Sequence, residues 1–272
     1  MASNVLFNDI NEIAEKDLKT RGEFLFQILE KYGIEKFFKD NDDEVGDSDN
    51  FYNWLKENEW LDCEERSALE YIDWFSSGVT RNVIGSEILH CVLKFDIDQR
   101  CYEDNQGLHY VDFSAVETKI YELAEKKGLE KYFAKIIPIG KICGHTFYAS
   151  EYAYVDDISM SDEVCNWTFK NFCKANNIKE NEEDTWDLFY EDPLSVEYDR
   201  HEGMFAYAAE EWGVMESDQV EHFLQQLNIG DCHSGNWGRT LENGSLIITD
   251  YAGYELHKLI NWKALGFIKE EE

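Results

Sequence analysis

Hydrophobic residues recur three or four positions apart in the first part of the chain, which is the spacing of an amphipathic helix. The positions are Ile10, Ile13, Ala14, Leu18, Phe24, Leu25, Ile28 and Leu29. They predict a helix that Asn8 can cap and that continues past Arg21 and Gly22. Shorter helices are predicted over residues 51–57 and 64–74, which makes residues 1–68 a helical region.

Short strand-like runs then alternate with further helical segments. Apolar runs bounded by turn residues lie at 74–84, 88–95, 136–142, 146–153, 237–240 and 246–249. Helical spacing returns at 113–127, 161–174, 200–213 and 217–227. Hairpins and helices in this order predict an α+β fold.

A single lysine interrupts the apolar run at residues 88–95. From a rigid strand, Lys94 could reach nucleotide phosphates if a carboxylate on a neighbouring helix held its ammonium group. Glu117 is the expected partner, because it lies early in the helix predicted at 113–127 and close to its apolar face. The alternatives are an edge-strand lysine in water and a glutamate that the helix dipole favours.

Two further segments could contact a nucleotide through their backbone. The small-residue loop before Lys94 contains Gly78 and could lie over phosphates and donate N–H groups to them. An ordinary hairpin fits this loop equally well. The stretch from Glu151 to Ala153 ends the run at 146–153, where a linker between two lobes would fall.

The most specific chemical pattern lies near the end of the chain. Asp231 is followed five positions later by Asn236, and Asp250 ends the apolar run at 246–249. The hairpin predicted between them would return Asp250 to Asn236. An aspartate and two metal ligands in this order suit phosphoryl transfer. Because the chain has 57 acidic residues, a surface turn before an ordinary hairpin is the alternative.

The order of these candidate residues along the chain resembles that of the protein-kinase-like superfamily. The residues are Lys94, Glu117, Asp231, Asn236 and Asp250. The pattern is most similar to small bacteriophage serine/threonine kinases and to the aminoglycoside-phosphotransferase-like group. The resemblance implies that Lys94 contacts phosphate, that Glu117 holds Lys94 and that Asp231 is the catalytic base. It also implies that Asn236 and Asp250 bind Mg²⁺ and that ATP is the second cofactor.

The resemblance further implies a two-lobed protein-kinase-like fold with a helical extension at residues 1–68, an N-lobe at 69–153 and a truncated helical C-lobe at 154–272. Glu151 to Ala153 would then be the hinge that binds adenine, and Gly78 would lie near the phosphates. Ile229-Gly230 replaces the His-Arg of protein kinases, and few residues follow the metal-binding hairpin. We therefore expect a minimal C-lobe that does not bind peptides in the usual manner.

Composition limits the partners. The formal net charge is −32, and acidic residues concentrate at 40–65 and 180–202. Such a surface repels nucleic acid and anionic lipid, so we expect no direct nucleic-acid binding. The charge either keeps the protein soluble or forms a surface for a basic protein partner. Hydrophobic residues at 43% and aromatic residues at 15% predict a folded core despite this charge.

The chain shows no pattern of secretion or of membrane insertion. It has no apolar run near the length of a membrane span, and its first ten residues carry no basic residue. The seven cysteines form no C-x-x-C pair, which favours reduced thiols in a cytoplasmic protein. A zinc site at Cys232 and His233 lacks partners at the usual spacing.

Two functions remain as hypotheses. The first is an ATP- and Mg²⁺-dependent phosphotransferase, more specifically a phage-type serine/threonine kinase that acts on host proteins, with a small-molecule acceptor such as an aminoglycoside left open. The second is a non-catalytic acidic inhibitor with a kinase-like scaffold. It would imitate nucleic acid and block the basic cleft of a host defence or DNA-handling protein.

Overall fold

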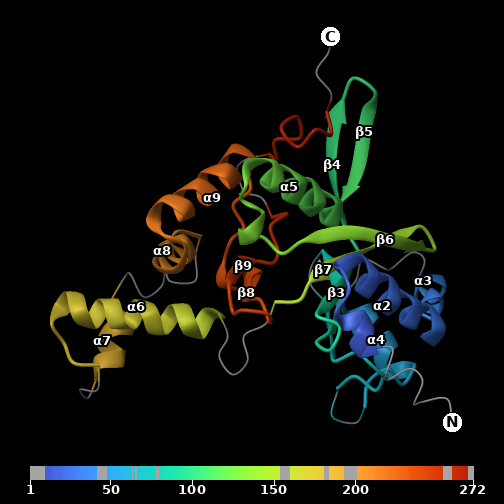
Figure 1. Ribbon diagram of the computed structural model, residues 1–272, viewed down its shortest axis with the longest axis horizontal. Coiled ribbons are helices and arrows are strands. Elements are labelled where there is room, and N and C mark those ends of the chain that lie inside the picture. The colour runs from blue at the N-terminus through green and yellow to red at the C-terminus, as the bar shows by residue number, and fades with distance from the viewer. Residues whose placement is uncertain are drawn as a thin grey trace. The chain divides into compact units, whose positions relative to one another are not determined.

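A five-stranded antiparallel sheet organises the first part of the chain (Figure 1). The computed structural model describes residues 10–41, 48–62, 64, 66–77, 80–153, 160–180, 184–192, 201–253 and 259–268. The fold is α+β, as the sequence predicts. The chain divides into two compact units, the first within residues 1–126 and 134–152 and the second within residues 127–133 and 153–272.

The strands of the sheet run in the order β1 (Trp74–Ser77), β2 (Arg81–Ser86), β3 (Cys91–Asp96), β7 (His145–Glu151) and β6 (Ile136–Ile142). Residues directly opposite each other on neighbouring strands project to the same face. Ile84, Leu93 and Ala149 are aligned in this way and are fully buried. Phe95 and Phe147 lie on the same face and are also fully buried. One face of the sheet is therefore apolar.

Three helices supply the other half of this core. They are α2 (Leu18–Tyr32), α3 (Glu35–Asp40) and α4 (Ser48–Glu57). Phe38 of α3 and Phe51 of α4 each place their ring 5.3 Å from that of Phe95, edge to face. Gly22 of α2 lies so close to β7 that an added Cβ would come within 2.4 Å of the Cβ of Ala149. The helices and the sheet therefore share one hydrophobic core.

Two helix predictions in this region need correction. The helix expected to run on from Ile10 is interrupted at residues 15–17, because the side chain of Asp17 accepts the N–H of Thr20 and starts α2 anew. Asn8, the expected cap, lies outside the described residues. No helix occupies the described residues between 64 and 74, where the side chain of Asp62 accepts the N–H groups of Glu64 and Arg66 and forms a turn.

Helix α5 (Phe113–Lys127) matches the predicted helix, but its start is held differently. From the sequence, Asp112 or Ser114 is available to cap this helix. Instead, Asp96 at the end of β3 accepts both the N–H and the hydroxyl of Ser114, at 3.0 and 3.1 Å. Between β3 and α5 the chain forms a two-stranded hairpin, β4 (Gln99–Asp104) and β5 (Gly107–Asp112), that the hydrophobic pattern does not predict.

The second unit is mainly helical. Its elements are η1 (Glu130–Tyr132), α6 (Met160–Asn176), α7 (Thr185–Glu191), α8 (His201–Trp212), α9 (Val214–Gln226), η3 (Ser234–Asn236), β8 (Trp237–Arg239) and β9 (Leu246–Ile248). The helices predicted at 161–174, 200–213 and 217–227 correspond to α6, α8 and α9. Arg239 joins α6 and α8 to the β8–β9 hairpin, because its guanidinium group donates to Glu163 of α6 and to Tyr207 and Glu211 of α8. In the part of the chain that the structure describes, no helix is both long and apolar enough to cross a membrane.

Candidate functional site

The polar face of the sheet carries Lys94. Lys94 lies opposite Val83 on β2 and Tyr148 on β7, on the face away from the aromatic core. Its Nζ atom is 3.1 Å from Oε2 of Glu117 on α5. The side chain of Lys94 is 8% exposed and that of Glu117 is not exposed at all. The structure therefore contains the ion pair expected between these two residues, in a setting where water screens it weakly.

A second cation, which the sequence reasoning missed, binds the same carboxylate. Nη1 of Arg81 lies 2.7 Å from Oε2 of Glu117, and the Arg81 side chain is 5% exposed. Arg81 begins β2, where nothing in the local pattern distinguishes it from a loop residue. Strand register was the signal that could have found it, because the β2–β3 hairpin places Arg81 opposite Asp96, on the face that carries Lys94. Glu117 thus joins two buried cations at once.

Asp96 connects this cluster to the start of α5. Burial raises the pKa of the Asp96 carboxyl group to about 7, against the opposing effect of the Arg81 charge. Its oxygens accept from Ser114, three positions before Glu117, so Asp96 fixes the turn of helix that carries Glu117. Capping of α5 by Asp96, 18 positions away in sequence, explains how Glu117 is held against the face of the sheet that carries Lys94.

Backbone groups at Gly78 and at residues 151–153 are expected to contact a nucleotide, and those at 151–153 are less well suited to this role than Lys94 and Glu117. Gly78 lies outside the described residues. The N–H of Glu151 donates to the carbonyl oxygen of Lys135 and the N–H of Tyr152 to that of His90, while the Glu151 carboxylate accepts the N–H of Lys135. Ala153 forms a β-bridge with Thr240 in the second unit. The backbone N–H groups of residues 151 and 152, where the sequence predicts an adenine-binding hinge, therefore already donate hydrogen bonds within the protein.

Asp231 stands in an exposed loop after α9. Its side chain is 53% exposed, and its Oδ1 is 3.7 Å from Nε2 of His233. Nδ1 of His233 accepts the N–H of Gly235 at 3.1 Å, so a neutral His233 ring carries its proton on Nε2. A carboxylate with this exposure is accessible to a substrate hydroxyl.

Asn236 connects the loop to the end of β9. Its Nδ2 donates to the carbonyl oxygen of Asp231 at 2.6 Å, so its Oδ1 remains as the atom that can bind a metal. The backbone carbonyl of Asn236 accepts the N–H groups of Thr249 and Asp250, at 2.7 and 3.2 Å. The predicted hairpin is present, and it brings Asp250 beside Asn236.

Gly253 is a further residue of this loop cluster that sequence reasoning did not single out. A Cβ built on Gly253 would lie 2.0 Å from the Cβ and 2.6 Å from Oδ2 of Asp231. No real side chain tolerates such a contact, so the absence of a Cβ at 253 lets Asp231 lie against the backbone. The sequence feature that could have drawn attention to Gly253 was its position three residues after Asp250.

The oxygen donors of this cluster suit Mg²⁺. An amide oxygen from Asn236 and a carboxylate from Asp250 are hard ligands, and Mg²⁺ usually takes one or two protein carboxylates and completes its shell with water and phosphate oxygens. Among the described residues, no group of three or more His, Cys, Asp and Glu side chains could hold a metal unaided. Burial raises the pKa of the Cys232 thiol, which disfavours the thiolate that zinc would require.

Comparison of the chain with protein-family models, with curated proteins and with solved structures found no match.

Proposed function

We propose that this protein is an ATP- and Mg²⁺-dependent phosphotransferase with a two-lobed kinase-like fold and a serine or threonine hydroxyl of a protein as its acceptor. The observation that carries the proposal is the buried ion pair between Lys94 and Glu117. A lysine on a central strand, held by a helix carboxylate, is the arrangement that a kinase uses to present an ammonium group to phosphates. Within the second unit, the N–H of Asp250 donates to the backbone carbonyl of Asn236, and this link between the two expected metal ligands supports the proposal independently.

Each residue has a defined part in the proposed reaction. Lys94 binds phosphate oxygens, and Glu117 orients its ammonium group. Asn236 and Asp250 would hold Mg²⁺, and the bound ion would neutralise charge on the phosphates. The substrate oxygen attacks the γ-phosphorus as the bond to the β-phosphate oxygen breaks and ADP leaves with the electron pair. Asp231 takes the proton of the attacking hydroxyl.

Two variants test the two groups of residues separately. Asp231→Asn should lower transfer of phosphate from γ-labelled ATP by roughly 10²–10⁴-fold, the usual effect of losing a general base. It should leave ATP binding, measured by calorimetry with Mg²⁺, unchanged. Lys94→Ala should weaken ATP binding itself, because it removes the ammonium group that contacts phosphate.

Matched controls are available on the surface. Asp218→Asn removes an exposed aspartate of the second unit, and Lys119→Ala removes a lysine of α5 that pairs with Glu122 in solvent. Both should keep full transfer and binding. Unchanged transfer in Asp231→Asn, or unchanged ATP affinity in Lys94→Ala, would refute the role assigned to that residue.

The net charge of −32 favours one alternative function. A catalytically inert protein with this charge could occupy the basic cleft of a DNA-handling protein as an imitation of nucleic acid. It would bind such a partner in a salt-sensitive way, and Asp231→Asn would not alter that binding. Calorimetry distinguishes the two candidates, since absence of heat with ATP, both with and without Mg²⁺, favours the inhibitor.

A further inference from the structure

The first unit contains a cavity of about 810 Å³ that the proposed phosphotransferase does not use. Its lining residues come from the β4–β5 hairpin, from the end of β3 and from the turn between β6 and β7. Its lining includes Asp96, Asp98, Tyr110, Asp112, Lys141 and Tyr148. The size suits a large side chain together with part of the segment that carries it.

The polar groups of the cavity are arranged for a cation. The carboxylates of Asp98 and Asp112 line it together with Asp96, whose pKa burial raises to about 7, against one lysine, Lys141, and one histidine, His145. Asp112 is fixed in place, because its Oδ1 accepts Nε2 of Gln99 at 2.7 Å and its Oδ2 accepts the hydroxyl of Tyr148 at 3.2 Å. Tyr110 adds an aromatic wall over which a guanidinium or ammonium group can rest.

Exposed apolar side chains adjoin the cavity. Leu108 and Tyr110 on β5 are 56% and 64% exposed, and they alternate with inward residues so that both project from one face of the hairpin. In the described part of the chain, β4 and β5 pair only with each other. A small cation could occupy the cavity but would leave Leu108 exposed. A protein segment could occupy the cavity and cover Leu108 as well.

We propose that this hairpin surface, formed by the cavity and by the exposed face of Leu108 and Tyr110, binds a basic extended segment of a protein partner. A lysine or arginine of the segment enters the cavity between Asp98, Asp112 and Tyr110. An apolar residue beside it packs on Leu108. Charge complementarity selects the partner, since the segment must be basic to gain from the carboxylates and from the overall charge of −32.

The proposal is tested by fluorescence anisotropy on the full chain. The probe is a labelled decapeptide of alternating lysine and leucine, and the reference probe replaces lysine with glutamate. Asp98→Asn and Leu108→Ser should each weaken binding of the basic probe on the order of tenfold. The matched controls are Asp218→Asn, which removes one exposed charge elsewhere, and Met215→Ser, which removes one exposed apolar side chain elsewhere. Both controls should bind like the unaltered protein.

Three results would overturn the proposal. Equal losses in Asp98→Asn and Asp218→Asn would show attraction by net charge alone. Equal affinity for the basic and acidic probes would show that the leucine side chains of the probe, and not its charges, account for binding. Displacement of the probe by spermine, together with unchanged affinity in Leu108→Ser, would assign the cavity to a small polyamine. None of these variants alters a residue of the proposed phosphotransferase, so phosphate transfer should persist in all of them.

Discussion

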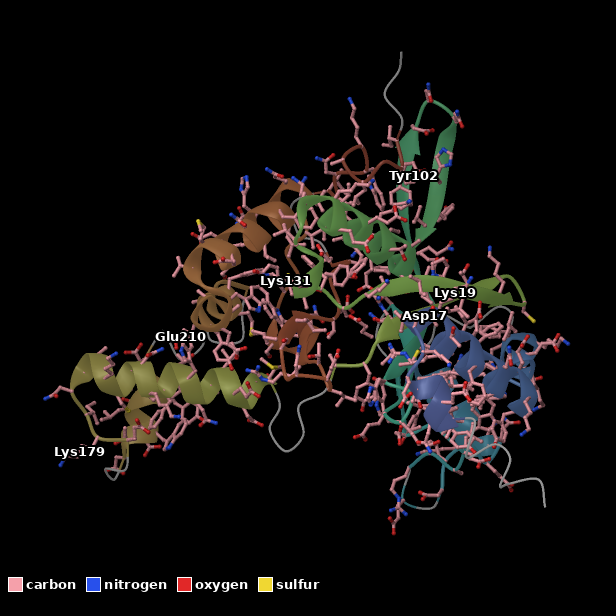
Figure 2. The ribbon with its side chains drawn as sticks, viewed as in Figure 1. Asp17, Lys19, Tyr102, Lys131, Lys179 and Glu210 are labelled. Carbon is pink, nitrogen blue, oxygen red and sulfur yellow. The ribbon has the colours of Figure 1, made fainter. Side chains whose placement is uncertain are left out.

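The two groups of candidate residues are held by the fold in opposite ways. Lys94 and Arg81 are buried and meet the buried Glu117 across 23 and 36 positions of sequence. Figure 2 draws the described side chains as sticks on the ribbon. Asp231 and His233 are half exposed, and their loop is closed by a hydrogen bond between residues five positions apart. The buried cations depend on the whole sheet and helix α5, whereas the exposed carboxylate depends on a short loop. Substitutions in the first group should therefore affect stability, and those in the second mainly chemistry.

Glu117→Gln is the strongest test of that contrast. It leaves Lys94 and Arg81 buried without their shared carboxylate, and breaking a buried pair in this way costs about 3–5 kcal/mol of unfolding free energy. Urea unfolding measures the loss of unfolding free energy for the whole protein. Hydrogen exchange of the β3 amides reports the loss of stability in that strand.

The control for Glu117→Gln lies on the same helix. Glu122 forms a pair with Lys119 whose side chains are 44% and 42% exposed, so Glu122→Gln should cost at most about 0.5 kcal/mol. If the two variants lose the same small amount, the Glu117 cluster does not carry the stability that its burial indicates.

Gly253→Ala tests how tightly Asp231 lies against the backbone. The added Cβ would overlap the Cβ of Asp231, and such overpacking costs about 1–3 kcal/mol. In an Asp231→Gly background the overlapping atom is gone, and the same substitution should cost much less. Urea unfolding of the unaltered protein, the two single variants and the double variant gives the double-mutant cycle. If the two losses of unfolding free energy simply add, the two residues are not in contact.

The pH dependence of stability tests Asp96. Its pKa is about 7 in the folded protein, above the ordinary 3.8, so the folded state retains the proton more strongly. This stabilisation is fully present below pH 4 and is lost as the pH rises through 7, with a slope of up to ~1.4 kcal/mol per pH unit. The charged neighbours that act on it are Arg81 on β2 and Asp112 at the end of β5.

Asp96→Asn should remove this slope between pH 5 and pH 8 in urea unfolding. Ser114→Ala is the matched control, because it removes a hydrogen bond to Asp96 and keeps the titrating carboxyl group. An unchanged slope in Asp96→Asn would mean that Asp96 does not titrate in this range.

The sequence predicted the parts of the site that depend on order and local periodicity. The helix at 113–127 places Glu117 by its spacing, and the hairpin after Asn236 returns Asp250 through a turn that local residues determine. The pairing of Lys94 with Glu117, 23 positions apart, was expected from chemistry, because a strand lysine that contacts phosphates needs a carboxylate on a neighbouring helix. The first two of these inferences need only a short window of sequence.

The parts that were missed depend on pairing between distant strands. Arg81 meets Glu117 only because β2 and β3 align in one register, and Asp96 caps α5 across 18 positions. The β4–β5 hairpin and the cavity beside it carry polar and exposed apolar residues, which local patterns assign to loops. The helix expected at 64–74 is replaced by a turn because a single side chain, Asp62, outweighs the apolar spacing.

The smallest expected change in stability belongs to the variant with the largest expected loss of activity. Asp231→Asn keeps the shape of an exposed side chain and leaves the backbone bond to Asn236 intact, so the free energy of unfolding should change by less than about 0.5 kcal/mol. Urea unfolding of Asp231→Asn beside Glu117→Gln measures both ends of the contrast. A cost of several kcal/mol in Asp231→Asn would mean that the loop carboxylate is structural, and a loss of phosphate transfer in that variant would then no longer identify a base.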